Sequence, residues 1–148
     1  MERFLEQPCD PSQLSPLTLA FIGDCVFELF VREQLVCQGN CPVKKLHNRS
    51  VEQVCCSAQC RDMDILFPIL EEKEREIFLR GRNAHVGHVP KNASLAEYHA
   101  ATGLEALFGY LYLKGDLSRL RYLFSLLPFG GGNNAVSSGS LGAAESRM

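Results

Sequence analysis

Two carboxylate side chains stand within two of the most apolar stretches of the sequence. Asp24 lies inside LAFIGDCVFELFVR, and Glu105 is the only charged residue of GLEALFGYLYL. An ionised carboxylate on an apolar helix costs several kcal/mol unless a partner compensates it. Each acid has a small residue close by, Gly23 beside Asp24 and Gly109 one turn after Glu105. Because small residues let helices approach closely, we expect the two acids to face each other across a helix contact.

A divalent metal would resolve the conflict between two facing acids. Without a cation between them, one carboxylate would be driven neutral. Mg²⁺ suits such a pair because it takes oxygen ligands and keeps several waters. The pattern also allows Asp24 and Glu105 to accept hydrogen bonds independently or to lie on exposed stripes. Glu28, on the same helical face as Asp24, either reaches the metal through water or pairs with an arginine.

Two basic segments accompany the acids. RGRNAHVGHVPKN, residues 80–92, holds three cationic residues and two histidines but no acid, and KKLHNR, residues 44–49, is a second cluster. Arginine presents a planar fork that matches phosphate oxygens, and lysine adds a flexible point charge. Basic clusters are also common on plain solvated faces. Beside a pair of acids they favour phosphodiester hydrolysis, which needs both a grip on phosphate and a metal.

The elements that must position these residues are helices. Hydrophobic periodicity predicts an all-α fold, with no convincing strand alternation. Helices are expected over residues 15–35, 41–50, 50–67, 71–83, 94–115 and 116–128. Ser15 and Pro16 open the first helix, Ser50 caps the third, and Ser94 with Glu97 forms a capping box.

The last two helix ends set the expected domain boundary. Gly115 ends the fifth helix, and Pro128 stops the sixth. We therefore expect one folded domain over residues 3–128. Residues 129–148 are rich in Gly, Ser and Ala and are predicted to be a disordered tail.

Composition limits the class of protein. The chain has 148 residues, enough for one domain, and a formal net charge of -2. Bulk charge does not indicate a nucleic-acid binder, so any polyanion site has to be a local basic patch. No uncharged apolar run approaches the length of about 18 residues that suggests a membrane span. The seven cysteines include no CxxC pair, so we expect reduced, mostly buried thiols in a cytosolic protein.

Four segments together resemble Mini-ribonuclease III, the compact branch of the ribonuclease III family that lacks a double-stranded-RNA-binding domain. They are LAFIGDCVFELFVR, LHNRSVEQVCCSAQC, RGRNAHVGHVPKNAS and EYHAATGLEALFGYLYL, in this order. The resemblance implies an all-helical bundle like the ribonuclease III endonuclease domain. It also implies a homodimer that cleaves double-stranded RNA with Mg²⁺. The expected substrate is the large-subunit (23S) ribosomal RNA precursor, in the bacterial cytoplasm or the plastid stroma.

The resemblance also assigns roles to single residues. Asp24 matches the catalytic aspartate of the family's signature helix, and Glu105 matches the glutamate of its later metal-binding helix, so both are expected to be catalytic and to bind Mg²⁺. The residues expected to bind RNA are Lys45, Arg80, Arg82, Asn83, His85 and Lys91.

The chain departs from typical ribonuclease III enzymes at two positions. Ala20 and Thr102 stand where those enzymes carry a glutamate and an aspartate, respectively. The loss of these two acids resembles the pattern of the Mini branch. Only two clear carboxylates remain as metal ligands. Glu28 and Thr102 are candidates for residues that surround these ligands without binding the metal directly.

Two other functions compete with the nuclease. A catalytically silent RNA-binding or ribosome-assembly module could share this fold, but such relatives lose the acids that Asp24 and Glu105 represent here. A plain helical protein-interaction domain would explain the apolar helices and leave both the acids and the basic loop as coincidences.

Overall fold

The chain folds into six α-helices, in a computed structural model that describes residues 2–84, 88–89, 91 and 93–129. The helices are α1 (Pro16–Val36), α2 (Val43–Val54), α3 (Cys56–Leu66), α4 (Glu72–Arg82), α5 (Leu95–Lys114) and α6 (Leu117–Ser125). Two short 3₁₀ turns are η1 (Pro11–Gln13) and η2 (Phe67–Ile69). The described ranges contain no strand, and the all-α prediction is confirmed. No helix in this part of the chain has the length and apolarity needed to cross a bilayer.

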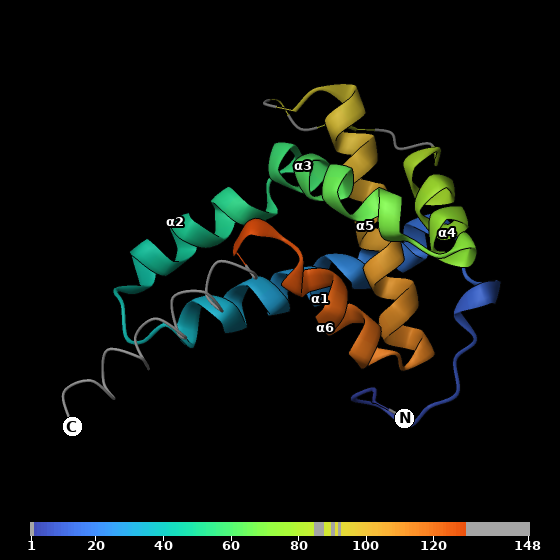
Figure 1. Cartoon of the computed structure of the whole chain (residues 1–148), viewed down its shortest axis with the longest axis horizontal. Coiled ribbons are helices and arrows are strands. Elements are labelled where there is room, and N and C mark those ends of the chain that lie inside the picture. The colour runs from blue at the N-terminus through green and yellow to red at the C-terminus, as the bar shows by residue number, and fades with distance from the viewer. Residues whose placement is uncertain (1, 85–87, 90, 92, 130–148) are drawn as a thin grey trace.

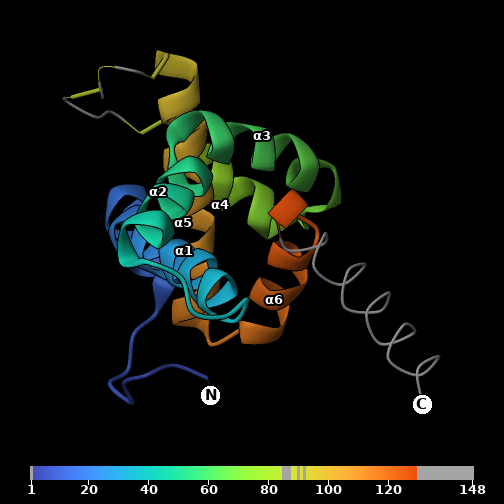
Figure 2. The ribbon, with the colours of Figure 1, turned by 90° about the vertical axis from the view of Figure 1, so that its left-hand side faces the viewer.

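Helices α1 and α5 cross at the centre of the molecule (Figure 1). Helices α3 and α4 pack against α5, α2 packs against α1, and α6 follows the end of α5 (Figure 2). Phe27 of α1 and Phe108 of α5 are fully buried and meet edge to face, with ring centroids 5.1 Å apart. Almost every residue of α5 from Ala101 to Leu111 is buried, as expected for a helix whose sequence is apolar on all sides. The core therefore wraps around the helix that carries Glu105.

Most of the predicted helix ends are confirmed. The Ser15 hydroxyl accepts the Thr18 backbone N–H at 3.2 Å, and Pro16 is the first helical residue of α1. Ser94 and Glu97 form both hydrogen bonds of the capping box at the start of α5. Gly115 ends α5 in the left-handed conformation, with φ of 84°.

The predicted cap at Ser50 is wrong. Helix α2 runs through Ser50, which is buried, and ends only where Cys55 adopts an extended conformation, with ψ of 158°. No glycine or proline marks this break, so local sequence gave no signal for it. At the C-terminal end, α6 finishes at Ser125 rather than next to Pro128.

The C-terminal end of the described chain still packs on the core. The ring of Phe129 lies 5.0 Å from that of Phe124, and the Phe129 carbonyl oxygen accepts a hydrogen bond from Gln34. Beyond this residue the predicted tail falls outside the described residues.

The cysteines are more exposed than predicted. Cys9, Cys25 and Cys37 are exposed, and the other four are partly exposed. The prediction of mostly buried thiols is wrong because leucine and phenylalanine fill the core, whereas the cysteines lie on helix surfaces and in connections.

Candidate active site

The crossing of α1 and α5 is a contact between two backbones. A Cβ atom added to Gly23 would lie 1.6 Å from the backbone carbonyl oxygen of Glu105, and one added to Gly109 would lie 2.0 Å from that of Leu19. Glycine is therefore required on both sides of the contact. Because Asp24 follows Gly23 and Glu105 precedes Gly109 by one turn, the same contact brings the two acids together.

The side chains of Asp24 and Glu105 lie within hydrogen-bonding reach of each other. Asp24 is exposed, whereas Glu105 is partly buried. Burial, followed by the negative charge of Asp24, raises the pKa of Glu105 to about 9. Without a cation Glu105 therefore holds a proton at neutral pH. A divalent ion bound between the two acids would displace that proton.

Two further side chains act on Glu105. The Glu28 carboxylate pairs with Arg32 at 3.2 Å, and its negative charge still adds to the raised pKa of Glu105. Gln59 comes from α3 and is buried. Its carboxamide lies within hydrogen-bonding reach of Glu105 and opposes the rise in pKa by favouring the ionised carboxylate. Three helices thus meet around one carboxylate.

The end of α4, which carries two of the predicted RNA-binding arginines, packs against α5 through a glycine. Arg80 and Arg82 are exposed and flank Gly81. A Cβ atom on Gly81 would lie 2.8 Å from the Cβ atom of Ala106, so the two helices touch here without a side chain between them. This contact fixes the end of α4 against α5 at the residue that follows Glu105.

The other predicted RNA-binding residues are distributed over separate elements. Asn83 caps α4 and accepts a hydrogen bond from the Arg82 Nε at 3.3 Å. Lys91 is exposed in the segment before α5, and Lys45 is exposed on α2, a different helix. His85 lies outside the described residues.

The sequence and the fold both match known ribonucleases. The ribonuclease III domain model matches residues 17–116. The Mini-ribonuclease 3 of Thermoanaerobacter sp. (strain X514) is 44% identical over 113 residues, covering 76% of this chain and 80% of that protein. The Mini-ribonuclease 3 of Symbiobacterium thermophilum is 47% identical over 111 residues, covering 75% and 85%. This chain belongs to the Mini-ribonuclease III branch of the ribonuclease III family.

The fold of this Mini-ribonuclease III is also similar to that of a solved structure. A crystal structure of a protein from Fusobacterium nucleatum aligns with a TM-score of 0.72 at 26% sequence identity, covering 80% of this chain and 91% of that one. Membership of the branch makes the chain an endoribonuclease. Members of the ribonuclease III family act on double-stranded RNA and generally depend on a divalent metal.

The donor set of this Mini-ribonuclease III fits a hard divalent cation. Asp24 and Glu105 supply carboxylate oxygens, which Mg²⁺ prefers, and the cation would remove the repulsion between them. Among the described residues, no group of three or more Asp, Glu, His or Cys side chains is arranged to enclose a metal. A Mg²⁺ ion held by the two acids would therefore keep water in the rest of its octahedral shell.

The two positions that depart from typical ribonuclease III offer little to a metal. Ala20 is buried and has no polar side-chain atom. Thr102 is also buried, and its hydroxyl donates to the Tyr98 carbonyl oxygen at 3.0 Å within α5. The Thr102 hydroxyl is thus held by a hydrogen bond within its own helix.

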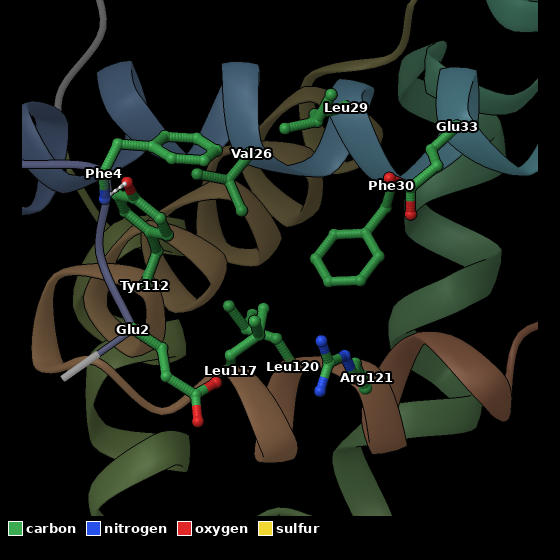
Figure 3. Close-up of a pocket in the computed structure, with 10 residues that line it drawn as sticks. All are labelled: Glu2, Phe4, Val26, Leu29, Phe30, Glu33, Tyr112, Leu117, Leu120 and Arg121. Carbon is green, nitrogen blue, oxygen red and sulfur yellow. Dashed lines mark hydrogen bonds between the residues drawn. The ribbon is translucent and has the colours of Figure 1, made fainter.

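A separate cavity of about 300 Å³ lies among α1, α5, α6 and the N-terminal segment (Figure 3). Val26 and Phe30 line it from α1, on the side of the helix opposite Asp24 at 3.6 residues per turn. Phe4 closes one end, where its backbone N–H donates to the Tyr112 hydroxyl at 2.8 Å. This cavity does not open onto the two acids.

Sequence reasoning missed Gln59. The residue is uncharged and belongs to no basic or acidic cluster, so a search for chemistry-bearing side chains passes over it. The available signal was its position, because Gln59 is a polar residue between the buried positions Ala58 and Met63 of an amphipathic helix.

Proposed function

We propose that this Mini-ribonuclease III cleaves double-stranded RNA with a Mg²⁺ ion held by Asp24 and Glu105. The observation that carries the proposal is the close pairing of the two carboxylates at a glycine-only helix crossing, where burial and then the charge of Asp24 raise the pKa of Glu105. When bound, Mg²⁺ lowers the pKa of a coordinated water and stabilises negative charge on the scissile phosphate. The chain contributes a rigid pair of carboxylates and a Glu105 that exchanges its proton for the metal.

The basic residues are proposed to hold the RNA backbone. Arg80 and Arg82 would bind phosphates next to the acidic pair, together with Asn83 and with Lys91 before α5. Lys45 on α2 and His85 would extend this contact. Recognition is expected to depend on A-form shape and phosphate contacts, because the deep major groove of duplex RNA hides the base edges.

A second copy of the chain is proposed to cover the exposed face of α1. Phe21 is 82% exposed there, one turn from Asp24, and Leu17, Leu29 and Val36 are exposed along the same helix. Exposed apolar patches of this kind commonly mark protein interfaces. A homodimer would present two acidic pairs, and each subunit would cut one strand of the duplex.

The proposed substrate is the precursor of large-subunit (23S) ribosomal RNA, whose ends the enzyme would trim. This proposal rests on the resemblance to Mini-ribonuclease III and on the bacterial Mini-ribonuclease 3 relatives. The proposed site of action is the bacterial cytoplasm, or the plastid stroma if the chain comes from a photosynthetic eukaryote.

Cleavage of an end-labelled RNA duplex, with Mg²⁺ or with chelator, tests the nuclease. Wild-type protein should cut only with the metal, and Asp24→Asn should bind the duplex without cutting it. Glu33→Gln is the matched control, because Glu33 is exposed on the same helix but lines the cavity on its other side. Normal cleavage by Asp24→Asn would refute the mechanism. Binding without cleavage by the wild-type chain under any divalent metal would favour a silent RNA-binding module.

A further inference from the structure

Gln59 is a buried polar residue that reaches Glu105 from a third helix. Only 2% of its surface is exposed, and α3, on which it lies, packs against α5. Its side chain lies within hydrogen-bonding reach of the Glu105 carboxylate, which approaches Asp24 of α1 on another side. Glu105 is therefore held between a neutral amide and a second acid.

The hydrogen bonding of Gln59 differs from that of other polar residues in the interior. Ser50 Oγ, Gln53 Oε1 and Asp62 Oδ2 are buried without a hydrogen-bond partner, whereas the Gln59 carboxamide has the Glu105 carboxylate within hydrogen-bonding reach. Burying an amide without a partner costs roughly 1–3 kcal/mol. A methionine would fill the same length of space without this cost. The contact with Glu105 is the interaction that gives a glutamine an advantage at this position.

An amide and a carboxylate make a directional contact. An ionised carboxylate only accepts hydrogen bonds, so the Gln59 carboxamide must donate its N–H to Glu105 in the metal-binding state. This bond occupies one lone pair of the carboxylate and fixes the rotation of the group. The remaining oxygen lone pairs are then free for a cation that Asp24 also binds.

We propose that Gln59 is a positioning residue for the metal site, which holds the Glu105 carboxylate in the orientation that binds a divalent cation together with Asp24. The inference rests on the proposed metal role of these two acids. Hydrogen-bond partners that orient metal ligands typically contribute a factor of about 10–100 to metal affinity.

Isothermal titration of the full chain with Mn²⁺, without RNA, tests this role. Gln59→Met should bind Mn²⁺ at least about tenfold more weakly than wild type. The matched control is Gln53→Met, since Gln53 is partly buried on α2 and does not affect Glu105. Binding of duplex RNA without metal should be unchanged in both variants. Cleavage by Gln59→Met should recover toward the wild-type rate as Mg²⁺ is raised, which a general structural defect would not produce.

The outcomes separate this inference from the proposed function. If wild-type protein binds Mn²⁺ no better than Asp24→Asn, the proposed metal site fails and the role of Gln59 fails with it. If wild type binds Mn²⁺ and Gln59→Met binds it within about twofold, only the role of Gln59 is overturned. If Gln59→Met does not fold, side-chain amide NMR signals of the wild type decide. The Gln59 signals should shift on addition of Mg²⁺ and those of Gln53 should not; unmoved Gln59 signals would overturn the proposal.

Discussion

Glu105 lies where its own charge is unfavourable. Burial and the neighbouring Asp24 both favour the protonated acid, whereas a metal ligand must be ionised. The amide of Gln59 favours the ionised form but does not reverse the balance. The metal-free site is therefore destabilised locally, and the energy released when a cation enters should appear as increased stability of the whole protein.

Glu105→Gln should stabilise the metal-free protein while abolishing cleavage. A glutamine can donate to Asp24 and carries no charge that must be suppressed, so we expect a gain of about 1–3 kcal/mol at pH 7.5. Thermal melting with and without Mg²⁺ measures this. Mg²⁺ should raise the melting temperature of the wild type and of the control Glu33→Gln, but not that of Glu105→Gln. An equal rise in melting temperature with Mg²⁺ in all three proteins would contradict the assignment of Glu105 as a metal ligand.

Asp62 gives a pH-dependent prediction that does not involve the metal. The residue is 3% exposed on α3, and burial raises its pKa to about 7. The folded state therefore retains a proton that the unfolded chain releases, so the stability that Asp62 contributes is complete at acid pH and is lost as pH rises through 7.

Asp62→Asn removes this titration. Between pH 5 and pH 8 the wild type should lose about 2–3 kcal/mol more unfolding free energy than the variant, as measured by urea denaturation. Asp64→Asn, an exposed position two residues along the same helix, should follow the wild type. Parallel pH profiles for wild type and Asp62→Asn would rule out a protonated Asp62.

At the scale of elements, the crossing of α1 and α5 sets the geometry of the site. The backbones touch at Gly23 and Gly109, so the distance between the two acids is fixed by main-chain contact rather than by flexible side chains. Helix α4 is held in the same way, since Gly81 touches α5 at Ala106 and Gly103.

Gly23→Ala should therefore damage stability and catalysis together. The new methyl group would meet the carbonyl oxygen of Glu105, which can move only if the helices separate. We expect a loss of about 3 kcal/mol in unfolding free energy and a large loss of Mg²⁺-dependent cleavage. Denaturant titration and duplex cleavage measure the two effects, with Cys25→Ala as a control at an exposed position of α1. Full cleavage by Gly23→Ala would show that the close crossing is not needed.

The elements also show what the sequence could and could not predict. Local chemistry marks the ends at Ser15, Ser94 and Gly115, because each cap satisfies backbone groups near it in sequence. The break at Cys55 has no such mark and depends on how α2 and α3 pack against different neighbours. The approach of Asp24 to Glu105 was predictable because a charged residue is conspicuous in an apolar helix. The contact of Gln59 was not, because a neutral amide on α3 does not differ in this way from its sequence neighbours.

At the scale of the whole molecule, α1 has two different sides. One side is buried against α5 through Leu19, Gly23 and Phe27, and the other exposes Phe21 and Leu29. Asp24 is exposed between them, next to Gly23. A second copy seated on the exposed side would therefore lie close to the acidic pair without displacing any core residue.

Phe21→Ser should weaken dimerisation without unfolding the subunit, because Phe21 makes little contact within its own chain. Burying one such side chain contributes about 1.5–3 kcal/mol, and a two-fold interface would bury two. Size-exclusion chromatography with light scattering measures the change, and coordinated cutting of both strands should be lost with the dimer. Phe4→Ser is the matched control, since Phe4 is 81% exposed but lies off α1. Identical masses for Phe21→Ser and wild type would exclude this face of α1 as the dimer interface.

The glycine crossing has a consequence for motion. Because its main-chain contact lies inside the core, the acids cannot separate by a loop movement, only by opening of the central helices. Backbone amides of α5 around Gly109 should therefore exchange with deuterium only through global unfolding, and those at the exposed start of α5 much earlier. An enzyme built in this way would keep its reactive groups in its slowest-exchanging region, and substrate binding would have to adapt through the surrounding basic segments.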